Sequence, residues 1–138
     1  MAGTYQFLSA VPKTEYRDFD LSFRVNPVSG DVAVKDTEGS IKQSIKNIVL
    51  TNFYERPFSP TLGGQITGAL FEFYTKELEI FLRKEIASLI KKIEPRVSLR
   101  EVLVGFNEET DTIRAKIEFS VIGTLKLSSL EIIFERVR

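Results

Sequence analysis

The stretch Glu77–Val97, with the sequence ELEIFLRKEIASLIKKIEPRV, divides the chain into a helical half and a strand-rich half. Apolar residues recur in it every three or four positions, which predicts an amphipathic helix over residues 76–93 with one buried face. Proline has no N–H for the helical ladder and disfavours the α conformation at the preceding residue, so Pro95 ends the helix at Glu94. The expected buried positions are Leu78, Phe81, Leu82, Ile86, Leu89, Ile90 and Ile93.

The tripeptide Glu94-Pro95-Arg96 follows at the point where strand-like sequence begins. In an extended segment, Glu94 and Arg96 project from the same side. One interpretation is a helix stop with an incidental surface ion pair, which contributes roughly 0–1 kcal/mol. The other is a docking turn, in which a rigid backbone presents an acid and a guanidinium to a partner at little entropic cost.

Composition narrows the possible functions. A chain of 138 residues predicts one domain, and 19 basic against 19 acidic residues argue against a binder of nucleic acid or anionic membranes. The absence of Cys and His removes thiolate and imidazole ligands and the commonest general base. We therefore predict protein partners and no cofactor, metal, catalytic residues or small-molecule substrate. Neither a secretory signal nor a run of membrane-spanning length is visible.

The N-terminal part predicts an arm. Residues 1–17 have no period, and residues 18–25 alternate so that Phe19, Leu21, Phe23 and Val25 would share one buried face of a short extended segment. We place the arm at residues 1–37 and a single domain at residues 38–138.

Helix signals open that domain. Ser40 and Gln43 form a capping-box pattern before a helix at about 41–51, and a short helix is expected at about 65–73. Thr75 can cap the helix over 76–93. The sequence leaves open whether the last two helices are continuous.

The C-terminal part of the predicted domain has the pattern of β-strands. Period-two alternation predicts strands at about 98–106, 112–122 and 126–136, with a bulge at Ser128–Ser129 to reconcile the third strand with Leu125 and Leu127. The predicted class is α+β, with two to three helices packed on one face of a small antiparallel β-meander and an extended N-terminal arm.

A family resemblance adds to this reading. The order IKQSIKNIVLTN, ERPF, Gly-Gly, LFEF and IEPRV resembles the sheath-initiator, or baseplate wedge, family of contractile-tailed phages, which has type VI secretion relatives and was long labelled lysozyme-like. The resemblance implies a protein of the virion tail baseplate, made in the host cytoplasm, with baseplate wedge proteins and tail sheath subunits as partners. It implies docking through Glu94, Pro95 and Arg96, with Glu55 and Arg56 of the ERPF loop as further candidates.

The resemblance also implies that the sheet offers an edge on which sheath subunits polymerise. A meander of three strands has two edges, and an exposed edge can accept a strand from another chain. The candidate sheath-contact residues on the two outer strands are Leu130, Ile132, Phe134, Val102 and Val104. The alternative function is a peptidoglycan-degrading, lysozyme-like glycosidase using Glu94. Such an enzyme needs an acid with a raised pKa, whereas Arg96 beside Glu94 would lower it.

Overall fold

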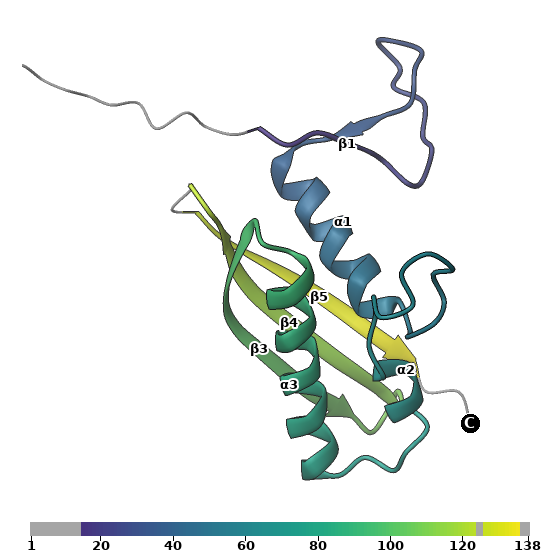
Figure 1. Cartoon of the computed structure of the whole chain (residues 1–138), viewed down its shortest axis with the longest axis vertical. Coiled ribbons are helices and arrows are strands. Elements are labelled where there is room, and N and C mark those ends of the chain that lie inside the picture. Colours follow the sequence, from purple (N-terminus) through teal and green to yellow (C-terminus); the bar gives the residue numbers. More distant parts are fainter. Residues whose placement is uncertain (1–14, 124–125, 136–138) are drawn as a thin grey trace, which may run out of the picture.

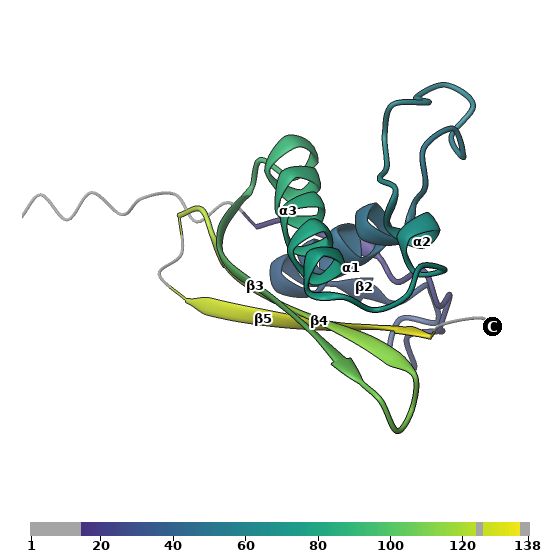
Figure 2. The same cartoon turned by 90° about the horizontal axis from the view of Figure 1, so that it is seen from below.

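Helices cover one face of a three-stranded antiparallel sheet, and no helix among the described residues covers the other face (Figures 1 and 2). The computed structural model describes residues 15–123 and 126–135. The elements are β1 (Asp18–Phe19), β2 (Val34–Lys35), α1 (Thr37–Leu50), α2 (Ile66–Ala69), α3 (Lys76–Ile93), β3 (Val97–Asn107), β4 (Thr112–Val121) and β5 (Leu127–Glu135). The predicted α+β class is confirmed.

The large sheet has the order β3-β4-β5, so β4 is central and the other two strands form its edges. The register shifts in β3 between Leu99 and Glu101, whereas β4 pairs with β5 continuously from Thr112↔Glu135 to Ser120↔Leu127. The bulge predicted at Ser128–Ser129 is therefore wrong. Leu127 is exposed and Ser128 is buried, so β5 keeps its alternation without an extra residue. Leu125 lies outside the described residues.

The core lies between the helices and β4. Its fully buried side chains come from α1, α3 and β4, together with Ile66 of α2. In α1, α3 and β4 they form one apolar stripe with the period of the element's own geometry. Phe81, predicted on the buried face of α3, is instead partly exposed. The largest members are Phe119, Ile41, Ile45, Ile66, Leu82, Ile86, Ile90, Ile113 and Ile117.

Both predicted helix starts can be compared with the structure. Thr75 caps α3 as expected, because its hydroxyl accepts a hydrogen bond from the Leu78 amide at 3.2 Å. The capping box at Ser40 is wrong: α1 begins one turn earlier, and Asp36 accepts from the Gly39 amide at 2.9 Å. Ser40 is buried inside the helix. The short helix α2 ends at Ala69, so α2 and α3 are separate helices.

The arm departs most from its prediction. β1 and β2 form a two-residue antiparallel ladder, and the side chains expected on a buried face, Phe19, Leu21, Phe23 and Val25, are all exposed. Alternation marks a half-buried strand only where a second apolar layer lies against it, and no described element covers this face. The first 14 residues of the predicted arm lie outside the described residues. Within residues 15–123 and 126–135, no helix is long and apolar enough to span a membrane.

Candidate functional site

The predicted docking turn lies where α3 passes into β3. The Glu94 amide donates to the Ile90 carbonyl at 2.9 Å and closes the helix, and the Val97 amide donates back to the Glu94 carbonyl at 3.3 Å. The Ile122 amide binds the Arg96 carbonyl at 3.0 Å, which ties the turn to the end of β4. The backbone around Pro95 is thus fixed on both sides, while the Pro95 ring is exposed.

Glu94 is buried, with 3% of its surface exposed. Its carboxylate accepts two hydrogen bonds from the Arg96 guanidinium, from Nε at 2.6 Å and from Nη2 at 2.7 Å. The Ser44 hydroxyl of α1 donates a third at 2.6 Å. This carboxylate therefore links α1 to the turn between α3 and β3, and because Glu94 is buried, the pair is not the incidental surface ion pair of the first interpretation.

The electrostatics of Glu94 favour its ionised form. Burial by itself would raise its pKa, but the hydrogen bonds from Arg96 and Ser44 and the charge of Arg96 outweigh burial and hold the pKa below its ordinary value. The same pair raises the pKa of Arg96. A carboxylate kept ionised in this way is a poor proton donor at neutral pH.

Arg96 is the member of the pair that reaches the surface, with 28% of its side chain exposed. Two of its five N–H groups bind Glu94, and the ring of Tyr16 from the arm lies 4.8 Å from its guanidinium carbon. Ile122, whose amide binds the Arg96 carbonyl, has an exposed side chain. The exposed residues of this turn are thus Pro95 and, in part, Arg96, whereas Glu94 is buried.

The structure does not bring Glu55 and Arg56 to this turn. They belong to a loop that leaves the C-terminal end of α1 and returns at α2, away from the junction of α3 and β3 (Figure 1). Glu55 accepts hydrogen bonds from the amide and the side chain of Asn52, at 3.0 and 2.7 Å. The loop projects from the helical layer (Figure 2), and its residue Phe58 is 99% exposed.

The two outer strands present their edges differently. The bond from the Ile122 amide to the Arg96 carbonyl makes these two residues a hydrogen-bonded pair, and such pairs alternate along an antiparallel ladder. Followed through the register of β4, this alternation points the N–H groups of Val102 and Val104 outward from β3. On β5 it points those of Leu130, Ile132 and Phe134 toward β4, and those of Ser129, Glu131, Ile133 and Glu135 outward.

Four of the five predicted sheath-contact residues, Ile132, Phe134, Val102 and Val104, have side chains buried in the core. Hydrophobic alternation identifies the residues facing the core, whereas a strand edge is made of backbone groups. On β3, Val102 and Val104 have both a core-facing side chain and an outward N–H group. On β5, the outward N–H groups belong to the residues next to the core-facing ones.

Two residues of the site were missed from the sequence. Ser44 lies 50 positions before Glu94, and Tyr16 lies in a segment without any period, so neither has a local signal that links it to the turn. Among the described residues, no group of three or more acidic side chains is arranged to hold a metal ion.

Comparison with known proteins places the chain among contractile-tail components. Residues 35–129 match the model of the family described as baseplate wedge protein gp25. The baseplate wedge protein gp25 of Enterobacteria phage T4 is 34% identical over 83 residues, which cover 60% of this chain and 63% of that protein. The match therefore spans less than two thirds of the T4 protein.

Two solved structures share the fold. A Geobacter sulfurreducens protein provisionally described as a tail lysozyme superposes with a TM-score of 0.70 at 23% identity, over 77% of this chain and 96% of its own. A chain of the anti-feeding prophage baseplate superposes with a TM-score of 0.62 at 19% identity, over 90% and 88% of the two chains.

Proposed function

This chain belongs to the baseplate wedge protein gp25 family, and from that premise we propose that it is a structural part of a tail baseplate that docks through its Glu94-Pro95-Arg96 turn and starts the tail sheath on a sheet edge. The strongest support for the second role is that β3 and β5 each have one edge without a partner strand among the described residues. Its location would be the virion tail, after synthesis in the host cytoplasm. Its partners would be baseplate wedge proteins and sheath subunits.

The docking role is supported by rigidity. A surface whose groups are already fixed loses little entropy on binding, and the turn is held by backbone bonds on both sides and by a buried carboxylate behind it. Pro95 and Ile122 are exposed apolar residues, and the partly exposed Arg96 has three N–H groups that Glu94 does not bind. Because Glu94 already neutralises Arg96, neutral acceptors such as main-chain carbonyls suit this surface better than a second carboxylate.

The docking test must avoid leaving one buried charge alone, since removing one partner of a buried pair typically costs about 3–5 kcal/mol. The double variant Glu94→Gln with Arg96→Gln removes both charges and keeps a polar side chain at both positions. We expect it to fold, judged by circular dichroism and thermal melting, and to be depleted from tail particles when it is co-expressed with the original chain. Normal incorporation would exclude docking through this turn.

The sheath role can be tested on β5 without disturbing the core. Proline lacks an N–H, so Glu131→Pro and Ile133→Pro each remove an outward donor, whereas Ile132→Pro removes a donor that binds β4 and an apolar side chain of the core. We expect the first two variants to enter baseplates that then fail to start a sheath, and the third to unfold.

The same test cannot separate the edge from the core on β3, because its outward donors belong to Val102 and Val104, whose side chains are buried. Proline at either position would destabilise the fold whether or not this edge binds a sheath strand. Normal sheath on baseplates that carry the outward prolines of β5 would therefore leave β3 as the only edge for strand addition.

The lysozyme-like alternative requires Glu94 to donate a proton to a glycosidic oxygen. Its carboxylate is buried, bound by two neighbours and held ionised, so we propose that the chain is not a glycosidase. We expect the purified chain to leave a turbid peptidoglycan suspension unchanged, and clearing that disappears in Glu94→Gln would contradict this.

A further inference from the structure

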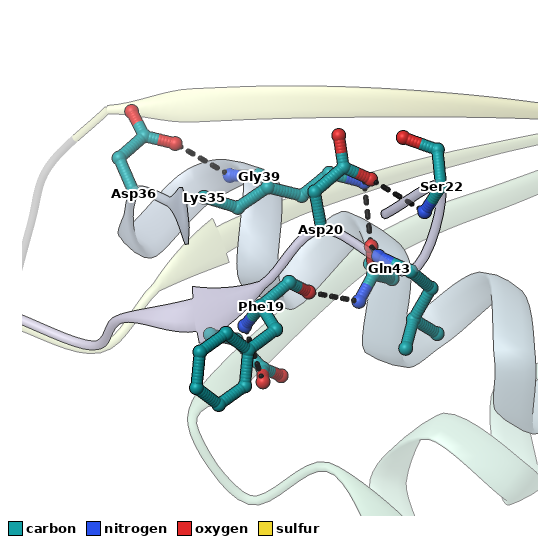
Figure 3. Close-up of polar contacts among 9 residues, drawn as sticks. Phe19, Asp20, Ser22, Lys35, Asp36, Gly39 and Gln43 are labelled. Carbon is teal, nitrogen blue, oxygen red and sulfur yellow. Dashed lines mark hydrogen bonds and ion pairs between the residues drawn. The ribbon is translucent and has the colours of Figure 1, made fainter. Parts of the chain in front are cut away.

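The arm is held on α1 by side chains of the helix that bind main-chain groups of the arm. The Thr37 hydroxyl accepts from the Tyr16 amide at 3.0 Å and donates to the Tyr16 carbonyl at 3.3 Å. The Gln43 amide group donates to the Phe19 carbonyl at 3.1 Å and accepts from the Leu21 amide at 3.4 Å, as a neighbouring strand would (Figure 3). The position of the arm thus depends on its backbone, and its apolar side chains remain exposed.

This attachment fixes Tyr16 against the docking turn. Thr37 holds the backbone of Tyr16 on both sides, and the Tyr16 ring lies over the Arg96 guanidinium at 4.8 Å. Glu94 meanwhile binds one edge of the same guanidinium through Nε and Nη2. Arg96 is therefore constrained on one edge and one face, and 28% of its side chain stays exposed.

We infer that Tyr16 is a positioning residue of the docking turn, which holds the Arg96 guanidinium flat for a partner without having to contact that partner itself. A free arginine side chain loses rotamer entropy when it is fixed on binding, and a ring already stacked on it removes part of that cost in advance. This inference rests on the proposed docking role of the turn. It extends that role to Tyr16 of the arm, which lies outside the family match over residues 35–129.

The opposite role, a cover that a partner must displace, fits the geometry less well. The ring lies on one face of the guanidinium, and 28% of the Arg96 side chain stays exposed with the ring in place. The two roles predict opposite effects of removing the ring, since losing a clamp weakens docking and losing a cover strengthens it.

The first experiment uses the purified full chain. Exchange of the Arg96 Nε–H with solvent is measured by nuclear magnetic resonance in the original chain, Tyr16→Ala, Tyr16→Phe and Gln43→Ala. A stacking contact of this kind corresponds to about a two- to fivefold change in an equilibrium. We expect Tyr16→Ala and Gln43→Ala to speed exchange about two- to fivefold, and Tyr16→Phe to behave like the original chain because it keeps the ring. The control is Tyr54→Ala, an exposed tyrosine on the loop after α1. Equal exchange in all variants would overturn the inference.

The second experiment separates this inference from the docking proposal. Each variant is co-expressed with the original chain during particle assembly, and the ratio of the two in purified tails is measured by mass spectrometry. We expect Tyr16→Ala to be under-represented about two- to fivefold, with Tyr16→Phe at parity and the double variant of Glu94 and Arg96 nearly absent. Parity or enrichment of Tyr16→Ala, with the double variant still absent, would overturn only the positioning role. Parity of the double variant would overturn docking and positioning together.

Discussion

At the scale of single residues, Glu94 shows how a charge can be buried without a partner outside the chain. Its carboxylate accepts three hydrogen bonds, and none of the buried side-chain polar atoms among the described residues is without a partner. A buried ion pair often stabilises a fold no better than an apolar replacement would. We interpret the pair as fixing the junction of α1, α3 and β3 in one arrangement, from which Arg96 reaches the surface.

Ser44→Ala tests this interpretation. The substitution removes one donor from a buried ionised carboxylate, and hydrogen bonds to charged groups contribute about 1.5–3 kcal/mol. We expect the free energy of unfolding to fall by about that amount in urea denaturation. Ser88→Ala is the matched control, because Ser88 is an exposed serine of α3 and its loss should change stability by less than about 0.5 kcal/mol. Equal effects of the two substitutions would show that the Ser44 contact contributes nothing.

A second prediction at this scale concerns pH. Glu38 in the first turn of α1 is bound by Lys126 and by Lys42, which lower its pKa from 4.5 to about 2. A carboxylate with a lowered pKa in the folded state stabilises the fold above its unfolded pKa, and that contribution is lost as the pH falls from about 4.5 to about 2. We expect the melting temperature of Glu38→Gln to fall less steeply over this range than that of the original chain. Parallel curves would contradict the shift.

At the scale of elements, the regular spacing of apolar residues was enough to predict the long helix and the long strands. Contacts between elements could not be predicted from the sequence. The helix over 76–93 and the three long strands follow from runs of ten or so residues with one period, because the core fills one side of each. The start of α1 was missed because two caps compete in the sequence, and Asp36 lies outside the apolar period that suggested Ser40. Of the site, Glu94 and Arg96 were readable from their spacing, whereas Ser44 and Tyr16 reach them only through the fold.

Gly63 shows a local requirement of the loop after α1. Asn52 and Gly64 form a parallel β-bridge that closes the base of the loop. Gly63, beside this bridge, has a φ of +134°. A Cβ on Gly63 would lie 2.6 Å from the Asn52 carbonyl oxygen, which is backbone and cannot move aside cheaply. We expect Gly63→Ala to destabilise the fold by about 1–3 kcal/mol or more. Gly30→Ala is the control, since Gly30 also has a positive φ but no atom within 4 Å of a Cβ. A larger loss at Gly30 would contradict the clash.

At the scale of the whole molecule, the chain consists of a packed domain and an arm that is attached by polar contacts. β4 is hydrogen-bonded on both sides, and its inward side chains are fully buried. The arm has a two-residue ladder, exposed apolar side chains and a few bonds to Thr37 and Gln43. Segments with few buried apolar contacts open at lower free energy than the core. The surfaces proposed for docking and sheath initiation both belong to the packed domain, and we expect the arm to open without unfolding that domain.

Native-state hydrogen exchange should distinguish opening of the arm from unfolding of the packed domain. The central amides of β4 can exchange only when the whole domain unfolds, because they are bonded within the sheet and covered by the helices. The Leu21 amide, whose acceptor is the Gln43 side chain, should exchange through an opening of the arm that is several kcal/mol easier than global unfolding. Gln43→Ala should therefore speed exchange at Leu21 and at Asp20, which pairs with Ala33, and leave the β4 amides unchanged. If the substitution lowered the protection of β4 to the same extent, the arm and the domain would unfold together, and an arm that orders independently would be ruled out.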